Sequence, residues 1–348
     1  MATIKSRYPY ILLLNLLFAC PVLSNILVVG SANADTFLPV ARLPTEGENL
    51  TLLSGKQPSI DVPGGKGCTQ AVAASKLTDK SVAFVGQFGQ DAAANVLLKA
   101  LQEAGVDTSN CGNHQDLSSG RGYVFLTQSG SVSAVVCGGS NQEGWKGWES
   151  TWRKEVLEDD KLSEEEIENL LNGVSCILLQ REVPEFVNLL IASRAKEKGD
   201  IIVIQDVGGE DRPISEEMLR FCDYLIPNES ELKRLVESFG DSPSLKEEDD
   251  EDSMVLSCAK YLQSKGARNV LVTRGSKGST LVTEGDKVIH HPAFVLPKEE
   301  VVDETGAGDC YRAAFAIALL EAHDLDKCMK FASAAGSCSV QVNGVSKR

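Results

Sequence analysis

The chain has 348 residues, of which 43% are hydrophobic, and a formal net charge of −15. This length and composition are typical of a soluble globular protein with one large core, to which a small lobe can be added. The excess of acidic residues argues against nucleic-acid binding, which needs a basic surface. The ten cysteines include no Cys-x-x-Cys pair and no zinc-like Cys/His cluster, so we expect reduced thiols in an intracellular protein.

Residues 1–24 precede the first predicted strand and are interpreted as a leader or a poorly ordered segment. Lys5 and Arg7, followed by the apolar stretch Tyr10–Phe18, also form the pattern of a secretory signal peptide. The candidate cleavage site of this signal peptide is Val22-Leu23-Ser24. However, the strand Ile26–Val29 begins too soon after it for a typical mature domain. A proline beyond the apolar stretch argues against a membrane-spanning helix. We therefore expect a cytoplasmic protein without a membrane partner, with a nuclear, plastid or exported location as the alternatives.

Strands and helices alternate along most of the chain. The predicted strands of this series are Ile26–Val29, Ser81–Val85, Cys176–Leu179, Ile201–Ile204, Tyr224–Ile226 and Asn269–Thr273. The predicted helices are Gln70–Leu77, Ala92–Ala104, Glu185–Lys198, Ser230–Phe239, Met254–Lys265 and Ala313–Leu320. Apolar strands that alternate with helices predict an α/β fold, with a doubly wound, mostly parallel central sheet flanked by helices. In such sheets ligands bind at the carboxyl edge of the strands.

Two regions do not fit this series and are expected to form a separate, small β-sheet. Its candidate strands are Leu50–Leu53, Ser59–Val62, Gly122–Leu126 and Val132–Val136, the last two joined at Ser129-Gly130. The strands of this small sheet would then lie mainly within 36–63 and 120–137. Two acidic runs, Glu158–Glu168 and Glu247–Asp252, are interpreted as solvated surface, and the second as a loop insertion.

The segment Val302–Asp309 carries the strongest functional signal. Gly306, Ala307 and Gly308 have little or no side chain, so a ligand can approach their backbone closely. Their N–H groups lie where a helix is expected to begin, and a helix N-terminus favours anions. The carboxylate of Asp309 would repel such an anion, unless it removes a proton from a hydroxyl that attacks a bound phosphate. The simpler interpretation is a glycine turn with an acidic residue in the first helical turn.

Polar segments follow several of the predicted strands. Asn33 and Asp35 can bond the hydroxyls of a sugar, although a simple turn also explains them. Gly64-Gly65-Lys66-Gly67 offers backbone donors and a lysine to a polyol or a phosphate, or only begins a helix. Gln180-Arg181-Glu182 ends a central strand, where charged side chains point into the crevice.

Two further segments come later in the chain. Pro227-Asn228-Glu229-Ser230-Glu231 can cap a helix through Asn228, or place Glu231 toward a metal-bound phosphate. Thr273–Gly278 is either a tight turn or the floor of a nucleotide site. Because the first strand is not followed by Gly-x-Gly-x-x-Gly and the glycine segments lack Walker spacing, an NAD-dependent dehydrogenase and a P-loop enzyme are disfavoured.

In this order, the segments resemble the ribokinase family of carbohydrate kinases, within the pfkB superfamily, from about Ile26 to Gly344. The matching features are Gly-Ser-x-Asn-x-Asp, Gly-Gly-Lys-Gly, Asn-Glu-x-Glu, Thr-x-Gly-Ser-Lys-Gly and the signature Asp-x-Thr-Gly-Ala-Gly-Asp. The resemblance implies one kinase domain over 25–344. It also implies that the small sheet is a lid that closes over the sugar and forms a homodimer interface.

The resemblance implies roles for individual residues. Asp309 would be the base that deprotonates the O5 hydroxyl of a pentose, while Gly306, Ala307 and Gly308 would form the anion hole for the γ-phosphoryl group. The pentose would be held by Asn33, Ala34, Asp35, Gly64, Gly65, Lys66, Gly67, Cys68, Glu182 and Asp309. ATP and its Mg²⁺ would be bound by Asn228, Glu231, Thr273, Arg274, Gly275, Ser276, Lys277, Gly278, Gly308 and, near the adenine, Ser333. A potassium ion would be surrounded by Asp303, Thr305, Ser339, Val342 and Gly344.

The chain departs from the family pattern at several positions. Cys68 and Thr69 stand where the family usually has Ala and Asn, which removes or replaces one sugar contact. Arg274 is a charge where an apolar residue is usual. The family continues beyond Gly344 with a Pro-Ser turn and a terminal helix, whereas 345–348 is a short tail, so we expect an incomplete potassium site.

The sequence thus predicts an ATP-dependent kinase that converts D-ribose to D-ribose 5-phosphate with Asp309 as the base. The segment Gln180–Pro184 favours ribose over the substrates of fructokinase-like relatives. One alternative is a kinase for another sugar or for a nucleoside. The other alternative is a catalytically weak, truncated relative that binds sugar without efficient turnover.

Overall fold

The computed structural model describes residues 25–128, 132–153, 161–210, 212–242 and 250–342. The expected leader at 1–24, the turn at Ser129-Gly130, Gly344 and the tail 345–348 therefore lie outside the described residues. None of the helices in the described part of the chain has the length and apolar character that crossing a bilayer needs.

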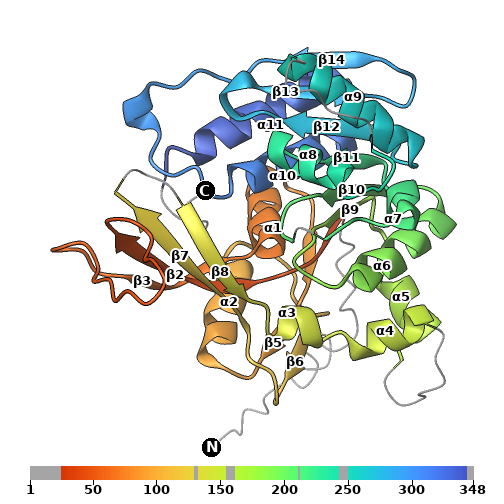
Figure 1. Ribbon diagram of the computed structural model, residues 1–348. Helices are drawn as coiled ribbons and strands as arrows, with labels where there is room; N and C mark the ends of the chain where they lie inside the picture. Colours follow the sequence, from red (N-terminus) through yellow and green to blue (C-terminus); the bar gives the residue numbers. More distant parts are fainter. Residues whose placement is uncertain (1–24, 129–131, 154–160, 211, 243–249, 343–348) are drawn as a thin grey trace, which may run out of the picture.

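A mostly parallel sheet forms the centre of the molecule (Figure 1). Its strands are β1 Ile26–Val29, β4 Val82–Val85, β9 Cys176–Leu179, β10 Ile202–Asp206, β11 Tyr224–Ile226, β12 Asn269–Thr273, β13 Ser279–Val282 and β14 Val288–His291. Within the described residues they lie in the order β14-β13-β12-β11-β10-β9-β1-β4. All pairs from β12 to β4 are parallel, and β13 and β14 extend the sheet with antiparallel pairs. The predicted doubly wound α/β fold is confirmed.

Helices cover both faces of this sheet, which explains why its strands are apolar throughout. In β1, Ile26 and Val28 join one core and Leu27 and Val29 join the other, because successive side chains point to opposite faces. The first core is shared with α1 Lys66–Leu77, α2 Ala92–Glu103, α10 Ala307–Leu320 and α11 Leu325–Ser339. The second core is shared with α4 Lys146–Arg153, α5 Glu164–Leu170, α6 Glu185–Lys198, α7 Glu216–Phe221, α8 Glu229–Glu237 and α9 Glu251–Ser264.

Several observed elements differ from the predicted ones. Helices α1 and α10 begin at Lys66 and Ala307, earlier than the predicted starts at Gln70 and Ala313, and the glycine-rich segments lie at their first turns. The strands β13 and β14 and the helix α11 were not predicted. Also unpredicted were β5 Gln87–Gly89, β6 Gly112–His114, α3 Ser140–Glu143 and the short 3₁₀ turns η1 Gly275–Lys277 and η2 Lys298–Glu300.

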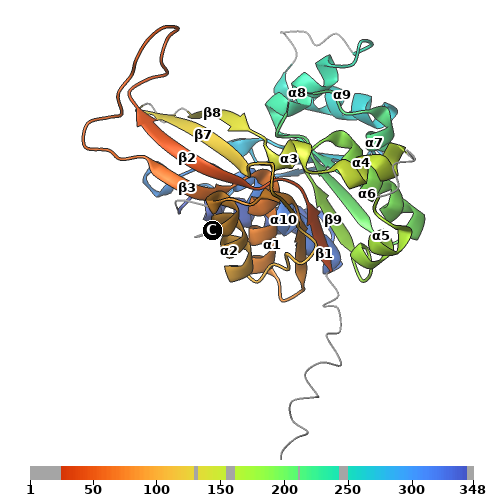
Figure 2. The same cartoon turned by 90° about the horizontal axis from the view of Figure 1, so that it is seen from below.

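A second, four-stranded sheet projects beside the central layer (Figures 1 and 2). Its strands are β2 Asn33–Val40, β3 Ser59–Gly64, β7 Gly120–Thr127 and β8 Val132–Cys137, in the order β3-β2-β7-β8. The predicted strand at Leu50–Leu53 is wrong. These residues lie in the long connection between β2 and β3, where the Leu53 N–H donates to the Pro39 carbonyl at 2.9 Å but no strand pairs with the segment.

The acidic runs are more structured than the sequence predicted. Glu164–Leu170 is the helix α5, which begins with a capping box between Ser163 and Glu166. In the second run the side chain of Asp250 caps α9, which places Glu251 and Asp252 in the first turn of that helix. The expected loop therefore ends before Asp250, and its residues 243–249 lie outside the described part of the chain.

Candidate active site

Polar segments meet along the carboxyl edge of the central sheet. They follow neighbouring strands in the order β1, β9, β10, β11 and β12, and are Gly30–Asp35, Gln180–Glu182, Asp206–Gly208, Pro227–Glu231 and Thr273–Gly278. The segments predicted to hold a sugar therefore lie at one end of this row, and the segment predicted to hold a nucleotide lies at the other. Asp206 lies between them.

Asn33 and Ala34 are buried where β1 leads into β2. The Asn33 Oδ1 accepts a hydrogen bond from the Asn141 Nδ2 at 2.8 Å. Asn141 also bonds the N–H and the carbonyl of Ala32, at 3.1 and 3.0 Å. Asn141 thus fixes the orientation of the Asn33 amide. It was not predicted, because it lies 108 residues away in the chain and outside every recognised segment.

The carboxylate of Asp35 lies between two glycines. A Cβ on Gly64 would come within 2.0 Å of the Asp35 Oδ2, and a Cβ on Gly122 would come within 2.2 Å of its Oδ1, so a side chain at either position would require the carboxylate to move. Burial and then repulsion from Glu182 raise the pKa of Asp35 to about 7, although a hydrogen bond from the Gly122 backbone lowers it. A ligand hydroxyl that donates to this carboxylate would favour its charged form.

The segment Gly64–Cys68 begins α1. Gly65 has φ +85, and a Cβ there would lie 2.8 Å from the Asn33 nitrogen. The backbone N–H of Lys66 donates to Glu182 Oε2 at 2.9 Å, which ties the start of α1 to the end of β9. Gly67 packs against the backbone of residues 30 and 31.

The side chains of Cys68 and Thr69 are directed into the protein. Cys68 is fully buried, and burial raises the pKa of its thiol to about 12, so the thiol is neutral. The hydroxyl of Thr69 donates to the Gly65 carbonyl at 2.9 Å within the helix. Both residues therefore act in packing and local bonding, and the predicted sugar contact of Cys68 does not involve an accessible thiol.

Asp309 lies in the first turn of α10. This helix is capped by Gly306, which has φ 77 in the left-handed region that suits glycine. A Cβ on Gly308 would lie 2.5 Å from Arg312 Nη1, so glycine is also needed to accommodate the arginine one turn later. Ala307 begins the helix, and its N–H donates to the Glu304 carbonyl at 3.2 Å. The first turn of a helix favours anions in general.

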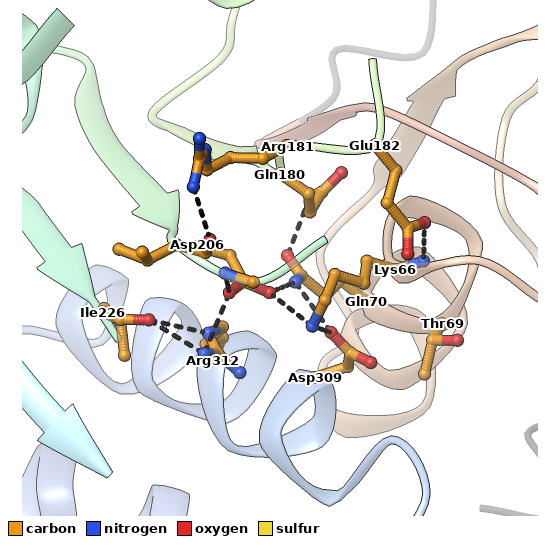
Figure 3. A network of polar contacts seen from close by, with 12 residues as sticks. Lys66, Thr69, Gln70, Gln180, Arg181, Glu182, Asp206, Ile226, Asp309 and Arg312 are labelled. Atoms are coloured by element: carbon orange, nitrogen blue, oxygen red, sulfur yellow. Dashed lines mark hydrogen bonds and ion pairs between the residues drawn. The ribbon is translucent and has the colours of Figure 1, made fainter. Parts of the chain in front are cut away.

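A network of charged and polar side chains surrounds Asp309 (Figure 3). The Gln70 Nε2 donates to Asp309 Oδ1 at 3.0 Å, and the Lys66 Nζ lies 3.8 Å from the same oxygen. Gln70 Nε2 and Lys66 Nζ also bond Asp206 Oδ2, at 3.0 and 3.2 Å. Arg312 contacts Asp206 Oδ1 at 2.9 Å. The site thus combines two carboxylates, two cations and one amide.

The surroundings change the proton affinities within this network. Burial raises the pKa of Asp309, Lys66 lowers it, Asp206 raises it and Arg312 lowers it, with a raised pKa as the result. For Lys66, burial alone would lower the pKa, but the two carboxylates outweigh it and the pKa is raised. Lys66 and Arg312 therefore stay charged, and Asp309 has the basicity that a general base needs.

Asn228 and Glu231 form the start of α8. The Asn228 Oδ1 accepts from the Glu231 N–H, and the Glu231 Oε2 accepts from the Asn228 N–H, both at 2.8 Å. This capping box explains both residue types locally. Glu231 Oε2 also lies 3.6 Å from Arg312 Nη2, so the capping carboxylate is joined to the network around Asp309.

The segment Thr273–Gly278 is a tight turn between β12 and β13, with η1 inside it. Gly275 and Gly278 have φ 56 and 92, and a Cβ on Gly278 would lie 2.0 Å from the His291 carbonyl. The Thr273 N–H donates to the Pro227 carbonyl at 3.0 Å, which joins the turn to the start of α8. Ser276 lies exposed within η1. Both the turn and the nucleotide interpretations fit this geometry.

Arg274 and Lys277 are paired with acidic residues at the starts of α8 and α9. The Arg274 Nε bonds Glu229 at 2.8 Å, and its Nη1 and Nη2 face Asp252 and Glu251. Lys277 bonds Glu251 and lies 3.8 Å from Glu229. The unusual charge at Arg274 is therefore paired with Glu251 and Asp252 of the second acidic run.

The described residues of the predicted potassium site lie around the C-terminus of α11. Val340 O accepts from the N–H groups of Val302 and Asp303 at 2.8 and 3.1 Å, and Asp303 Oδ1 accepts from the Thr305 N–H at 2.9 Å. Ser339 is buried, and the Val342 N–H lies 3.5 Å from its carbonyl. The loop 302–305 and the segment 339–342 are thus brought together.

The predicted site residues fall into groups that the fold brings together, with Ser333 buried on α11 beside Pro292.

Sequence reasoning missed Gln70, Asp206 and Arg312. Asp206 ends a buried strand, and Arg312 is the single basic residue of the mostly apolar helix α10, three residues after Asp309 and so on the same helical face. Both signals were present in the sequence. Within the described residues, no three His, Cys, Asp or Glu side chains are grouped to hold a metal ion by themselves.

Comparisons with known proteins extend over nearly the whole chain. The profile of the pfkB family carbohydrate kinases matches residues 23–347. A ribokinase of Arabidopsis thaliana is 37% identical over 330 residues, which cover 92% of this chain and 76% of the relative. A ribokinase of Haemophilus influenzae is 30% identical over 91% of this chain and 92% of its own.

Solved structures agree with these relatives. The structure of Arabidopsis thaliana ribokinase complexed with ribose and ATP has a TM-score of 0.76 and 36% identity, over 93% of this chain and 95% of that one. A ribokinase of Thermotoga maritima has a TM-score of 0.74 and 30% identity, over 92% and 94% of the two chains.

Proposed function

Because the chain belongs to the pfkB family of carbohydrate kinases, we propose that it is an ATP-dependent ribokinase with Asp309 as its general base. It transfers the γ-phosphoryl group of ATP to the O5 hydroxyl of D-ribose and yields D-ribose 5-phosphate and ADP. The observation that supports this assignment best is the buried carboxylate of Asp309, held in the first turn of α10 at the middle of the sheet edge.

The chemistry follows from that position. Gln70 and Lys66 hold Asp309 at Oδ1, so its second oxygen, which points away from both donors in Figure 3, takes the proton of the ribose hydroxyl. The sugar oxygen attacks the γ-phosphorus as the bond to the β-phosphate oxygen breaks and ADP leaves. Backbone N–H groups of Gly306, Ala307 and Gly308 bind the charge on the transferring group.

The two ends of the sheet edge divide the substrates between them. Asn33, Asp35 and Glu182 lie at the β1 and β9 end, where carboxylates and an amide suit sugar hydroxyls. The turn Thr273–Gly278 lies at the β12 end, where backbone donors suit a nucleotide. The ribose and ATP of the Arabidopsis structure support this pair of substrates.

Two metal ions belong to the proposal. Mg²⁺ keeps several waters and binds mainly through substrate phosphates, which suits Glu231, a carboxylate already bonded to Asn228 and close to Arg312. When bound, Mg²⁺ would offset phosphate charge. Potassium would be held by the oxygen donors of Asp303, Thr305, Ser339, Val342 and Gly344, which suit a hard cation. It would stabilise the loop that precedes the anion hole.

We also propose that residues 25–344 form one kinase domain that acts in the cytoplasm, and that the small sheet is a lid and a dimer surface. Exposed apolar side chains on this sheet support the dimer, namely Ile60 (64% exposed), Tyr123 (39%), Leu126 (40%), Val135 (57%) and Val136 (53%). Sedimentation of the purified protein and of Val135→Glu tests it, since the charge would convert a dimer to a monomer.

An assay of ADP production tests the activity directly. Purified protein with ATP, Mg²⁺, K⁺ and D-ribose is expected to form ADP, and Asp309→Asn is expected to lower kcat by roughly 10²- to 10⁴-fold. A panel that includes 2-deoxyribose, fructose and adenosine compares kcat/KM among acceptors. Turnover that is equal for wild type and Asp309→Asn would contradict the role of Asp309. A better acceptor than ribose would contradict the choice of sugar.

A further inference from the structure

Asp206 is the most heavily bonded carboxylate of the site, although no motif identified it. It is 1% exposed at the end of β10. Its Oδ1 forms an ion pair with Arg312 Nη2 at 2.9 Å and accepts from the Gly208 N–H at 2.8 Å. Its Oδ2 accepts from Lys66 at 3.2 Å and from Gln70 at 3.0 Å. A carboxylate with three hydrogen-bond donors and an ion-pair partner is fixed in place.

Two of these donors are shared with Asp309. Gln70 donates through the same Nε2 to both carboxylates, and Lys66 lies between them (Figure 3). The orientation of the Gln70 amide is not free, because its Oε1 accepts from Gln180 Nε2 at 2.9 Å. The amide nitrogen must therefore face the two carboxylates, and the position of Asp206 determines where Gln70 and Lys66 meet Asp309.

Arg312 holds Asp206 from the other side. It is 3% exposed, and its Nε and Nη2 donate to the Ile226 carbonyl at 3.2 and 2.8 Å. This anchor fixes the guanidinium to the end of β11. A buried carboxylate without such a partner would incur a large desolvation cost. The pair is thus a fixed unit beside the base, built from β10, β11 and α10.

We propose that Asp206, anchored by Arg312, is a positioning residue that orients Asp309 through Gln70 and Lys66 and sets the pH range in which Asp309 acts as a base. This inference rests on the proposed kinase function. Asp206 does not touch the reacting atoms. It divides Lys66 between two carboxylates, so that the lysine does not form a closed ion pair with Asp309 that would lower the basicity of the catalytic oxygen.

The charged groups that face Asp309 come from three elements. Lys66 of α1 and Arg312 of α10 lower the pKa of Asp309, and Asp206 of β10 raises it. Glu231 of α8 lies beyond Arg312, at 3.6 Å from it. The general base must be deprotonated, so activity falls on the acid side as the pH drops through the pKa of Asp309. Removal of Asp206 and removal of Arg312 should therefore shift this acid limb in opposite directions.

The test is the pH profile of kcat/KM for the wild-type protein, Asp206→Asn and Arg312→Gln. Asp206→Asn keeps the shape of the side chain, and we expect its acid limb to move to lower pH by roughly one unit with a fall in kcat of about tenfold. Arg312→Gln is expected to move the acid limb to higher pH. If Arg312→Gln does not fold, Lys66→Met replaces it, because Lys66 also lowers the pKa of Asp309.

The outcomes separate the two proposals. An inactive wild-type protein would contradict the kinase function itself. An active wild type whose variants lose activity without opposite shifts of the acid limb would overturn the role of Asp206, since a structural defect lowers the active fraction without moving the limb. Glu149→Gln is the matched control, because it removes a charge from the exposed ion pair with Arg153 and should leave the profile unchanged.

Discussion

The two ends of the active-site edge use charge in different ways. Around Asp309, the side chains of Asp206, Arg312 and Lys66 are 1%, 4% and 22% exposed, and each charge has fixed partners. Arg274 is itself 7% exposed, but its partner side chains Glu229, Glu251 and Asp252 are 28%, 65% and 66% exposed. Buried charges interact strongly and cannot be left unpaired, whereas exposed pairs are screened by water and salt.

The difference has a functional meaning. The reacting end needs fixed geometry, because small displacements of a base slow proton and phosphoryl transfer. The end proposed for the nucleotide would have to admit and release a large anion, and exposed ion pairs can exchange partners at little cost. The following predictions test whether this division holds, from the largest expected effect to the smallest.

Loss of the buried arginine should have the largest effect on folding. Arg312→Met leaves Asp206 buried without its main cation, so we expect the free energy of unfolding to fall by roughly 3–5 kcal/mol. Urea denaturation measures this change. Arg274→Met is the comparison, and its effect should be much smaller because Glu251 and Asp252 remain in water. An equal fall in the free energy of unfolding for Arg312→Met and Arg274→Met would contradict the distinction between the two ends.

A methyl group in the sugar end should be poorly tolerated. The Cβ of Gly64→Ala would lie 2.0 Å from Asp35 Oδ2, so the carboxylate must move, and we expect ribose binding to weaken roughly 10- to 100-fold. Isothermal titration calorimetry with ribose and with ATP measures both affinities, and that for ATP should not change. Gly240→Ala is the control, because a Cβ there meets no atom within 4 Å. Unchanged ribose affinity in Gly64→Ala would show that the site can relax.

Sugar binding should depend on pH near neutrality. The pKa of Asp35 is about 7 in the sugar-free protein, and hydroxyl donors favour the charged carboxylate, so ribose affinity should fall by up to about tenfold from pH 8 to pH 6. The raised pKa also means that Asp35 contributes stability at low pH, which is lost as the pH rises from about 4 through about 7. Calorimetry across this range measures the affinity. Asp35→Asn should give weaker binding without this slope.

Release of the nucleotide turn should have the smallest effect. In Glu251→Gln/Asp252→Asn, Arg274 and Lys277 keep Glu229 but lose two acidic partners and attract phosphate more strongly, so the KM for ATP should fall about two- to threefold at low salt. The difference should disappear at high salt, where exposed charges are screened. Glu165→Gln/Glu168→Gln removes two exposed charges from α5 and is the matched control. A KM difference that persists at high salt would show that this end is as rigid as the other.

Much of the central fold could be predicted because its strands are continuous apolar runs with both faces buried. The antiparallel strands β13 and β14 were missed, since their short, mixed sequences form strands by pairing, β13 with β12 and β14 with β13. The helix α11, Leu325–Ser339, was also missed. Leu50–Leu53 was assigned to a strand on apolar content alone, but a strand also needs a partner.

The site was predicted where local backbone geometry requires particular residue types. The roles of Gly64, Gly65, Gly67, Gly306 and Gly308 in turns, and of Asn228 as a helix cap, could be predicted from the residues next to them in the sequence. The members of the network do not, because Gln70 meets Asp206 and Asp309 from 136 and 239 residues away. Only the topology of the sheet, with β10 next to β9 and α10 beside α1, brings these side chains together.

The strand β2 has a mechanical consequence. Its first residues, Asn33 to Asp35, line the sugar end of the site, and the same strand continues to Val40 in the projecting sheet. Asp35 is paired with Val62 on β3 and with Gly122 on β7, so it moves with both neighbours. A movement of the outer sheet would therefore also move the Asp35 carboxylate, which we propose contacts the sugar.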